Sequence, residues 1–319
     1  MRIMQPGSSP VDIKNDAQFI KKWRPLEGWL VADGDDFVLP THHPVFARQF
    51  YASYCRKAHR DIIVTIIFFV LILSLLVTKP VEASSMYLVV FGLLFLFAVI
   101  DKKMSTMSLH NCQQKVEFLY NTKTAVKHMA VALLPCFIAL FAVQVWMTHY
   151  FDGYENLIVH AGNYYPNVSL ISSWRFITGP LIHADSQHLI INAVLSVLFA
   201  SMIPRATRRN VLSLLIAGAV VSHFSTYLFA QYFHSSFDAL LGISGGSFAL
   251  LACAIICYLR MQRINTALSL LAIFVLSELS LGLLSNNVSH VAHLSGFLLG
   301  ITVAIGVSPV ESRQVRIKS

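Results

Sequence analysis

Three groups of polar residues stand inside stretches of this chain that are otherwise apolar. They are Gly242-Ile243-Ser244-Gly245, Ala292-His293-Leu294-Ser295-Gly296, and His183 with His188 and Asn192. Burying a hydroxyl, an imidazole or an amide in hydrocarbon is costly, so such residues usually have a task. A serine becomes a useful nucleophile when a base lies within hydrogen-bond reach, and histidine is the commonest base. The pattern therefore predicts a nucleophilic Ser244 activated by His293.

The remaining polar residues suit the other half of an acyl-transfer reaction. Attack on a carbonyl creates an oxyanion, which needs hydrogen-bond donors already in place. The Ser244 backbone N–H could supply one donor, and the side chains of His188 and Asn192, one helical turn apart, could supply two more. Gly242 and Gly245 leave room for a substrate backbone beside the nucleophile. The expected chemistry is hydrolysis of a peptide bond inside a membrane.

The composition is that of an integral membrane protein. Of the 319 residues 55% are hydrophobic and only 13% are charged, and the mean hydropathy is +0.62. These values exclude an ordinary soluble domain of this size. Apolar runs near the length of a hydrocarbon core predict eight spans. Their expected ranges are 61–78, 85–101, 129–149, 187–204, 211–232, 240–259, 266–284 and 290–307.

The charge distribution predicts the orientation of these spans. The formal net charge is +8, but all of the 24 Lys and Arg residues except Lys79 and Arg175 fall on one side of an eight-span topology. This is the positive-inside asymmetry, so we expect both termini in the cytoplasm and no nucleic-acid partner. Residues 1–60 resemble neither a signal peptide nor a mitochondrial presequence, which favours the cell inner (plasma) membrane of a bacterium. The five cysteines are not expected to form disulfides.

We expect an all-α polytopic membrane protein with five parts. Residues 1–60 form a small cytoplasmic region, 61–101 a two-helix transmembrane hairpin, 102–128 a cytoplasmic linker, 129–308 a core of six transmembrane helices, and 309–319 a cytoplasmic tail. The first region could be a small folded domain or a partly ordered tail, because so short a piece buries little core. Gly296, Gly300 and Ala304 are spaced by four residues and predict a small-residue ridge for close helix packing.

These motifs together resemble the rhomboid family of intramembrane serine proteases. Gly242-Ile243-Ser244-Gly245 is similar to the family's GxSG motif, and Ala292-His293 with Gly296 and Gly300 is similar to its AHxxGxxxG motif. Trp174-Arg175 resembles its WR pair, Gly162-Asn163 resembles the GAN element that begins the same loop, and His183, His188 and Asn192 resemble its HxxxxHxxxN run. The resemblance covers about residues 128–308.

The resemblance implies a Ser244–His293 dyad without an acidic third member and an oxyanion site at His188 and Asn192. It also implies transmembrane protein substrates within the lipid bilayer, and neither a metal nor an organic cofactor. The chain departs from the family at Phe248, where a tyrosine often stacks on the catalytic histidine, and at His290, where asparagine is common. The two leading spans are an addition to the usual six.

Several polar residues have a plainer interpretation than catalysis. His183, Trp174 and Arg175 are expected mainly to support the long external loop. Asp238 could orient His293, although a solvated charge fits its loop position better. We expect no catalytic role for Glu278, and His223 and Gln144 are treated in the same way.

The alternative to an enzyme is a noncatalytic rhomboid-like membrane protein that binds client transmembrane helices. A protein of that class would be recognised by loss of the serine or the histidine, and both are present. A small-solute transporter is disfavoured, because the chain lacks charged or broken helices in repeat-related halves.

Overall fold

The computed structural model describes residues 1–77, 84–168, 172–233, 239–284, 289–306 and 316–318. The chain divides into two compact units. The first unit comprises residues 1–123, 261–286 and 311–319, and the second comprises residues 124–260 and 287–310. The long helix α4 (Leu109–Tyr150) contributes to both units.

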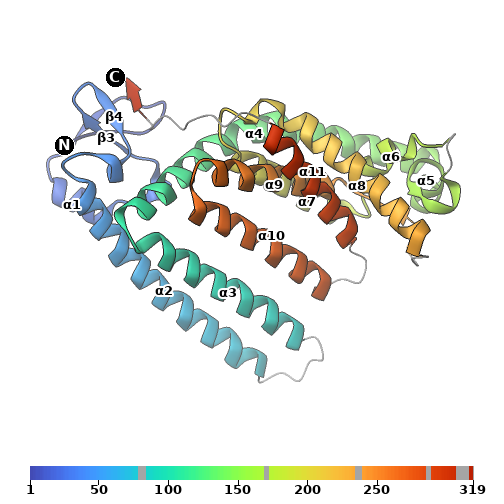
Figure 1. The fold of residues 1–319 in the computed structure, drawn as a ribbon, viewed down its shortest axis with the longest axis horizontal. Helices are drawn as coiled ribbons and strands as arrows, with labels where there is room; N and C mark the ends of the chain where they lie inside the picture. The colour runs from blue at the N-terminus through green and yellow to red at the C-terminus, as the bar shows by residue number, and fades with distance from the viewer. Residues whose placement is uncertain (78–83, 169–171, 234–238, 285–288, 307–315, 319) are drawn as a thin grey trace. The chain divides into compact units, whose positions relative to one another are not determined.

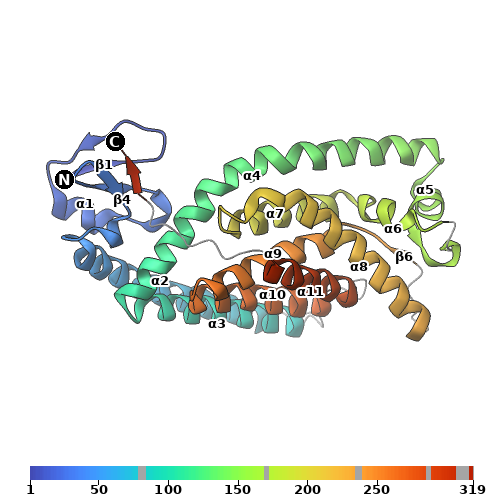
Figure 2. The ribbon, with the colours of Figure 1, turned by 45° about the horizontal axis from the view of Figure 1, so that its top comes forward.

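The first unit contains an antiparallel sheet in the strand order β2-β1-β3-β4-β7. The strands are β1 (Arg2–Met4), β2 (Val11–Asp12), β3 (Leu30–Asp33), β4 (Asp36–Val38) and β7 (Arg316–Lys318). Gly34 turns the β3–β4 hairpin with a φ of +63°, a conformation that favours glycine. The last strand comes from the other end of the chain, with Phe37 paired to Ile317 (Figure 2).

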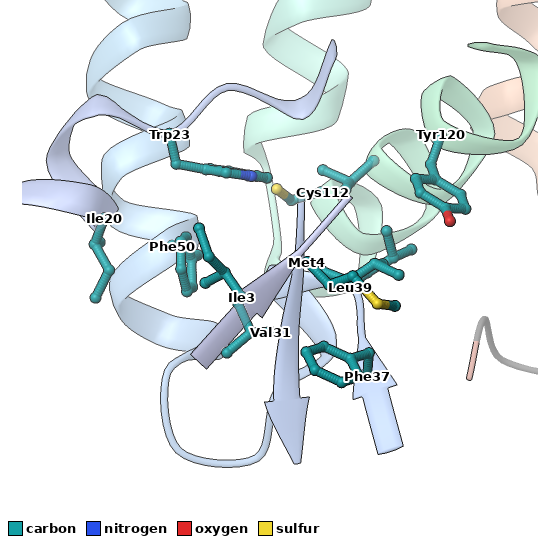
Figure 3. Packing of buried hydrophobic residues seen from close by; sticks show 12 residues of the cluster. Ile3, Met4, Ile20, Trp23, Val31, Phe37, Leu39, Phe50, Cys112 and Tyr120 are labelled. Carbon is teal, nitrogen blue, oxygen red and sulfur yellow. The ribbon is translucent and has the colours of Figure 1, made fainter. Parts of the chain in front are cut away.

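Aromatic side chains fill the core beneath this sheet. Trp23, which follows helix α1 (Asp16–Lys22), packs edge-on against Phe50 at 5.2 Å between ring centroids. Strand residues lie on one side of this pair, Cys112 of α4 lies beside Trp23, and Tyr120 of α4 belongs to the far side of the same cluster (Figure 3). Trp23, Phe50 and Cys112 are each at most 1% exposed. The N-terminal region therefore has a folded core.

Helices α2 (Ala47–Val77), α3 (Ser84–Thr106) and α10 (Ile264–Leu284) continue the first unit, with α3 next to both of the others (Figure 1). Asp101 on α3 accepts hydrogen bonds from Lys115 Nζ at 2.7 and 2.8 Å and from Ser269 Oγ of α10 at 2.6 Å. Glu117 on α4 accepts two bonds of 2.9 Å from the Arg263 guanidinium, just before α10. These polar contacts join one end of α10 to α3 and α4.

The second unit is built around α9 (Ser244–Arg260), with α7 (Ser186–Met202), α8 (Val211–Phe233) and α11 (His290–Gly306) packed against it (Figure 1). Most of α9 is buried on all sides, which is typical of a central helix. Arg260 at its end donates 2.8 Å and 3.1 Å bonds to the carbonyls of Ala304 and Ile305 on α11.

Among the described residues two helices, Leu109–Tyr150 and Arg208–Phe233, are long and apolar enough to cross a membrane. The pair Arg175–Leu181 and Ser186–Met202, bent by 96°, adds a third if it is one span. Three further apolar helices are shorter: Ser244–Arg260, Ile264–Ser280 and His290–Gly306. The count of eight spans stays a prediction, and residues 78–83 between α2 and α3 lie outside the described residues.

The structure adds detail at two of the expected boundaries. Residues 109–128, predicted as part of a linker, are helical and continuous with the following apolar segment in α4. The helix expected at 240–259 begins only at Ser244, because strand β6 (Ala239–Leu240) pairs with β5 (Asn163–Tyr164) and the chain then turns at Gly242. Ser244 is therefore the first residue of its helix.

Candidate active site

The turn before α9 places Ser244. Strand β6 brings the chain to Gly242, whose φ of +93° is a backbone conformation that residues with a side chain rarely adopt. The backbone N–H of Gly246 donates a 2.9 Å bond to the carbonyl of Ile243, which starts the helix at once. As the first residue of α9, Ser244 has a backbone N–H without a partner inside the helix. That N–H is available to a bound group.

Ser244 and His293 lie within hydrogen-bond distance. Ser244 Oγ is 2.9 Å from His293 Nε2, although 49 residues separate them in the chain. At this distance the hydroxyl donates to an unprotonated imidazole nitrogen, which is the geometry that general-base activation needs. The centroid of the Phe248 ring, one turn along α9, lies 4.5 Å from that of His293 at an angle of 44°. The aromatic ring thus limits how the imidazole can turn.

Glycines allow the helices that carry this pair to touch through their backbones. A Cβ atom at Gly296 would clash with the carbonyl of Gly245, and one at Gly300 would clash with the carbonyl of Ala249. Gly245 itself lies against Ser222 of α8. Gly296, Gly300 and the buried Ala304 form the ridge that the sequence predicts. Only such close approach lets the short serine side chain reach an imidazole on another helix.

The side chains of His188 and Asn192 face the turn that precedes Ser244. A Cβ atom on Gly242 would lie 2.9 Å from His188 Nε2 and 3.3 Å from Asn192 Nδ2. The carboxylate of Asp185 caps α7 by accepting a 2.7 Å bond from the His188 N–H. The N–H of Ala184 donates to His188 Nδ1 at 3.4 Å, so a neutral ring carries its proton on Nε2, which faces Gly242.

Asn192 provides a second donor beside His188. Its side chain is 2% exposed, and its Nδ2 has no hydrogen-bond partner within the described part of the chain. A buried amide donor without a partner is costly, and such groups are uncommon in folded proteins. An oxyanion bound next to the Ser244 N–H would satisfy this donor.

His183 is fully buried, and its ring contacts that of His188 with the centroids 5.2 Å apart. Its backbone is held by Gln144 of α4, which donates a 2.8 Å bond to the His183 carbonyl and accepts a 3.0 Å bond from the His183 N–H. The Tyr154 hydroxyl of α5 (Tyr154–Ala161) donates to the same carbonyl at 2.9 Å. Burial raises the pKa of Tyr154 to about 12, so this donor keeps its proton at neutral pH.

Trp174 and Arg175 make their contacts within the loop. Arg175, at the start of α6 (Arg175–Thr178), donates a 2.8 Å bond to the carbonyl of Gly162 and lies 4.9 Å from the ring centroid of Trp174. Arg175 is buried, whereas Trp174 is 44% exposed. This geometry suits a supporting role for both residues.

Two residues for which the sequence predicted no catalytic role contact the site. Gln144 holds the backbone of His183, and His223 of α8 hydrogen-bonds the carbonyl of Gly242 and the amide of Asn163. The only sequence signal was that each stands in or beside an apolar segment. Asp238 lies outside the described residues. Within the described residues, no group of three His, Cys, Asp or Glu side chains could hold a metal ion.

Comparison with known proteins identifies the domain that contains these residues. Residues 172–310 match the family model of the Rhomboid domain, a range that contains Ser244, His293, His188 and Asn192. No curated protein matches the chain. The family match and the apolar helices agree with the fold class expected from composition, which is confirmed. The chain therefore contains a Rhomboid domain at residues 172–310, and it is an all-α multi-pass membrane protein.

Proposed function

We propose that this protein is an intramembrane serine endopeptidase that uses Ser244 as its nucleophile and His293 as its general base. The observation that carries the proposal is the 2.9 Å separation of Ser244 Oγ and His293 Nε2. Two side chains from different helices reach this geometry only because glycines bring the helices into backbone contact. Structural packing alone does not require a hydroxyl to face an imidazole there.

The reaction would proceed through an acyl-enzyme. His293 Nε2 takes the proton of the Ser244 hydroxyl while Oγ bonds to the scissile carbonyl carbon, whose oxygen becomes an oxyanion. The Ser244 N–H, His188 Nε2 and Asn192 Nδ2 donate to that oxygen. The imidazolium then returns its proton to the leaving amine as the C–N bond breaks. Water, deprotonated by His293, attacks the ester and releases the second product with Ser244 restored.

The substrate class follows from the family and from the chemistry. Rhomboid family proteins act on membrane-protein substrates within the bilayer. A carbonyl that is hydrogen-bonded inside a helix is shielded from attack, so the substrate segment must unwind at the cleavage site. Gly, Pro or polar residues near that site lower the cost of unwinding. We propose transmembrane segments of this kind as substrates, with a small side chain before the scissile bond.

The decisive experiment compares the wild-type protein with Ser244→Ala and His293→Ala in lipid, on a fluorogenic transmembrane substrate. Each substitution should lower kcat by at least about 1,000-fold, because the two groups act as a unit. Ser247→Ala is the matched control. Ser247 lies one turn along the same helix, where its hydroxyl is 2.8 Å from that of Ser196, and its loss should leave kcat unchanged.

The alternative is a noncatalytic protein that binds client transmembrane helices. Under that alternative the wild-type protein would bind the substrate without cleaving it, and Ser244 would not react with a fluorophosphonate probe. Cleavage that survives both dyad substitutions would instead show that the hydrolysis arises elsewhere. Either result would remove the proposed activity.

We further propose that the protein lies in the inner (plasma) membrane of a bacterium, with both termini in the cytoplasm. The distribution of Lys and Arg supports this orientation. In a cysteine-free variant we introduce one cysteine at a time, as Ser8→Cys or Asp152→Cys, and apply an impermeant thiol reagent to intact cells. The cysteine at residue 152 should be labelled, and the cysteine at residue 8 should not. Labelling at residue 8 would contradict the proposed orientation.

A further inference from the structure

His223 lies in the middle of α8, has no exposed surface and uses both ring nitrogens. Its Nε2 is 3.0 Å from the carbonyl oxygen of Gly242, and its Nδ1 is 3.2 Å from Asn163 Nδ2. Because a carbonyl only accepts, Nε2 carries the proton and donates it. Nδ1 then accepts from the Asn163 amide, so Asn163 selects the tautomer that faces Gly242.

Gly242 occupies a position where the direction of its carbonyl matters. A Cβ atom added at Gly242 would point at His188 and Asn192, the two proposed oxyanion donors. If the Gly242 carbonyl turned toward them, it would accept their hydrogen bonds and place a partial negative charge where the oxyanion must form. The bond from His223 holds that carbonyl away. It also fixes the peptide plane just before Ile243 and Ser244.

The surrounding backbone encloses this arrangement. Asn163 is in β5, which pairs with β6, and β6 ends two residues before Gly242. The loop that contains Asn163 is therefore joined to the turn by backbone as well as side-chain bonds. Gly179 closes the other side, because a Cβ atom there would lie 2.6 Å from Asn163 Cβ and 2.9 Å from His223 Nδ1. His223 therefore has little freedom to adopt another position.

We propose that His223 is a positioning residue for the oxyanion site, and that Asn163 sets its tautomer. This inference rests on the proposed peptidase function, because it assigns His223 a role in the same reaction. His223 does not touch the substrate. It acts through Gly242, by keeping the carbonyl of that residue out of the site and by holding the turn that presents the Ser244 N–H.

A positioning role and a purely structural role predict different kinetics. Interhelical hydrogen bonds in membranes often serve packing alone, and their loss lowers stability without changing the chemical step. Misplacement of an oxyanion donor instead slows the chemical step, with a cost of up to about 100-fold in rate for a shift of 1 Å. Substrate binding elsewhere along the transmembrane segment would be unaffected.

The test compares His223→Leu with His223→Gln in lipid, by kcat and KM on a fluorogenic transmembrane substrate. His223→Leu removes the donor and should lower kcat by about 10- to 100-fold with KM changed less than about twofold. Gln retains an N–H near the position of Nε2, so His223→Gln should recover most of that loss. Thr226→Val is the matched control: it removes a buried 2.8 Å bond within α8, to the Ser222 carbonyl, and should leave kcat unchanged.

Asn163→Leu provides a second route if substitutions at His223 prevent folding. That variant keeps the imidazole but removes the amide that selects the tautomer, and it should also lower kcat without raising KM. Thermal unfolding and the rate of Ser244 labelling by a fluorophosphonate probe are measured for every variant. Slower labelling in a variant that unfolds at the wild-type temperature would support positioning.

Two results would overturn the inference alone. One is a wild-type kcat in His223→Leu or, where that variant does not fold, in Asn163→Leu. The other is an equal loss in His223→Leu and His223→Gln while both remain folded. In each case Ser244-dependent cleavage by the wild-type protein would persist, so the peptidase proposal would stand. Wild-type protein that shows no Ser244-dependent cleavage would remove both.

Discussion

Gly296 of α11 lies directly against the backbone carbonyl of Gly245 on α9, with no space between them for a Cβ atom. Gly245 follows Ser244, and Gly296 lies three residues after His293. The contact therefore sets the distance between the two helices at the level of the proposed dyad. The 2.9 Å Ser–His separation depends on it.

Replacing Gly296 by alanine should separate the dyad. The added methyl group would force α11 away from α9, lowering kcat by at least about 10-fold and the free energy of unfolding by about 1–3 kcal/mol. Gly306→Ala is the control, because a Cβ atom at that end of the same helix meets open space. A Gly296→Ala variant with wild-type turnover would show that the helix contact does not govern the reaction.

Asn192→Leu should lower kcat without lowering the free energy of unfolding. Leucine has a similar size and removes a buried amide donor that has no partner in the described residues. The free energy of unfolding should stay unchanged or rise, because an unsatisfied buried polar group costs about 1–3 kcal/mol. Loss of an oxyanion donor should lower kcat about 100- to 1,000-fold. Measuring kcat and the unfolding temperature on the same samples tests both; full activity would exclude Asn192 from the oxyanion site.

The buried pair of Glu117 and Arg263 should be sensitive to loss of one partner. Their side chains are 7% and 10% exposed, so Glu117→Gln leaves a guanidinium buried without its countercharge. We expect a loss of about 3–5 kcal/mol in the free energy of unfolding. The double variant Glu117→Leu with Arg263→Leu should lose less free energy of unfolding than Glu117→Leu alone or Arg263→Leu alone. A denaturation series in detergent measures these losses. Additive losses would mean that the pair is not coupled.

The first unit should become less stable below neutral pH because of His42. Burial lowers the pKa of this imidazole below its ordinary value of 6.5, with the Glu117 charge acting in the opposite direction. The unfolded chain therefore binds the proton more tightly than the folded one. The contribution of His42 to the free energy of unfolding is fully present above pH 6.5. It is lost as the pH falls from 6.5 to the pKa of His42 in the folded protein. Thermal unfolding from pH 8 to pH 5 should show this decline in the wild type, and a reduced decline in His42→Gln; identical curves would contradict it.

Much of the candidate site was predictable from the sequence for a physical reason. Polar groups are conspicuous in an apolar segment, and Ser244, His293, His188 and Asn192 each stand in one. The structure brings these four residues to one turn, although their catalytic roles stay predictions. His223 and Gln144 gave the same kind of signal without a recognisable motif, so the sequence offered no way to identify their partners.

The membrane class and the approximate helices were set by the sequence alone, because a bilayer demands long apolar runs and composition reports them directly. The tertiary structure decided which distant segments meet: Ile317 beside Phe37 in the sheet, α10 beside α3, and Asn163 at His223. Local pattern holds no information about such pairings, because each depends on backbone approach over long chain separations. The start of α9 at Ser244 was settled in the same way, by the pairing of β6 with β5 and the turn at Gly242.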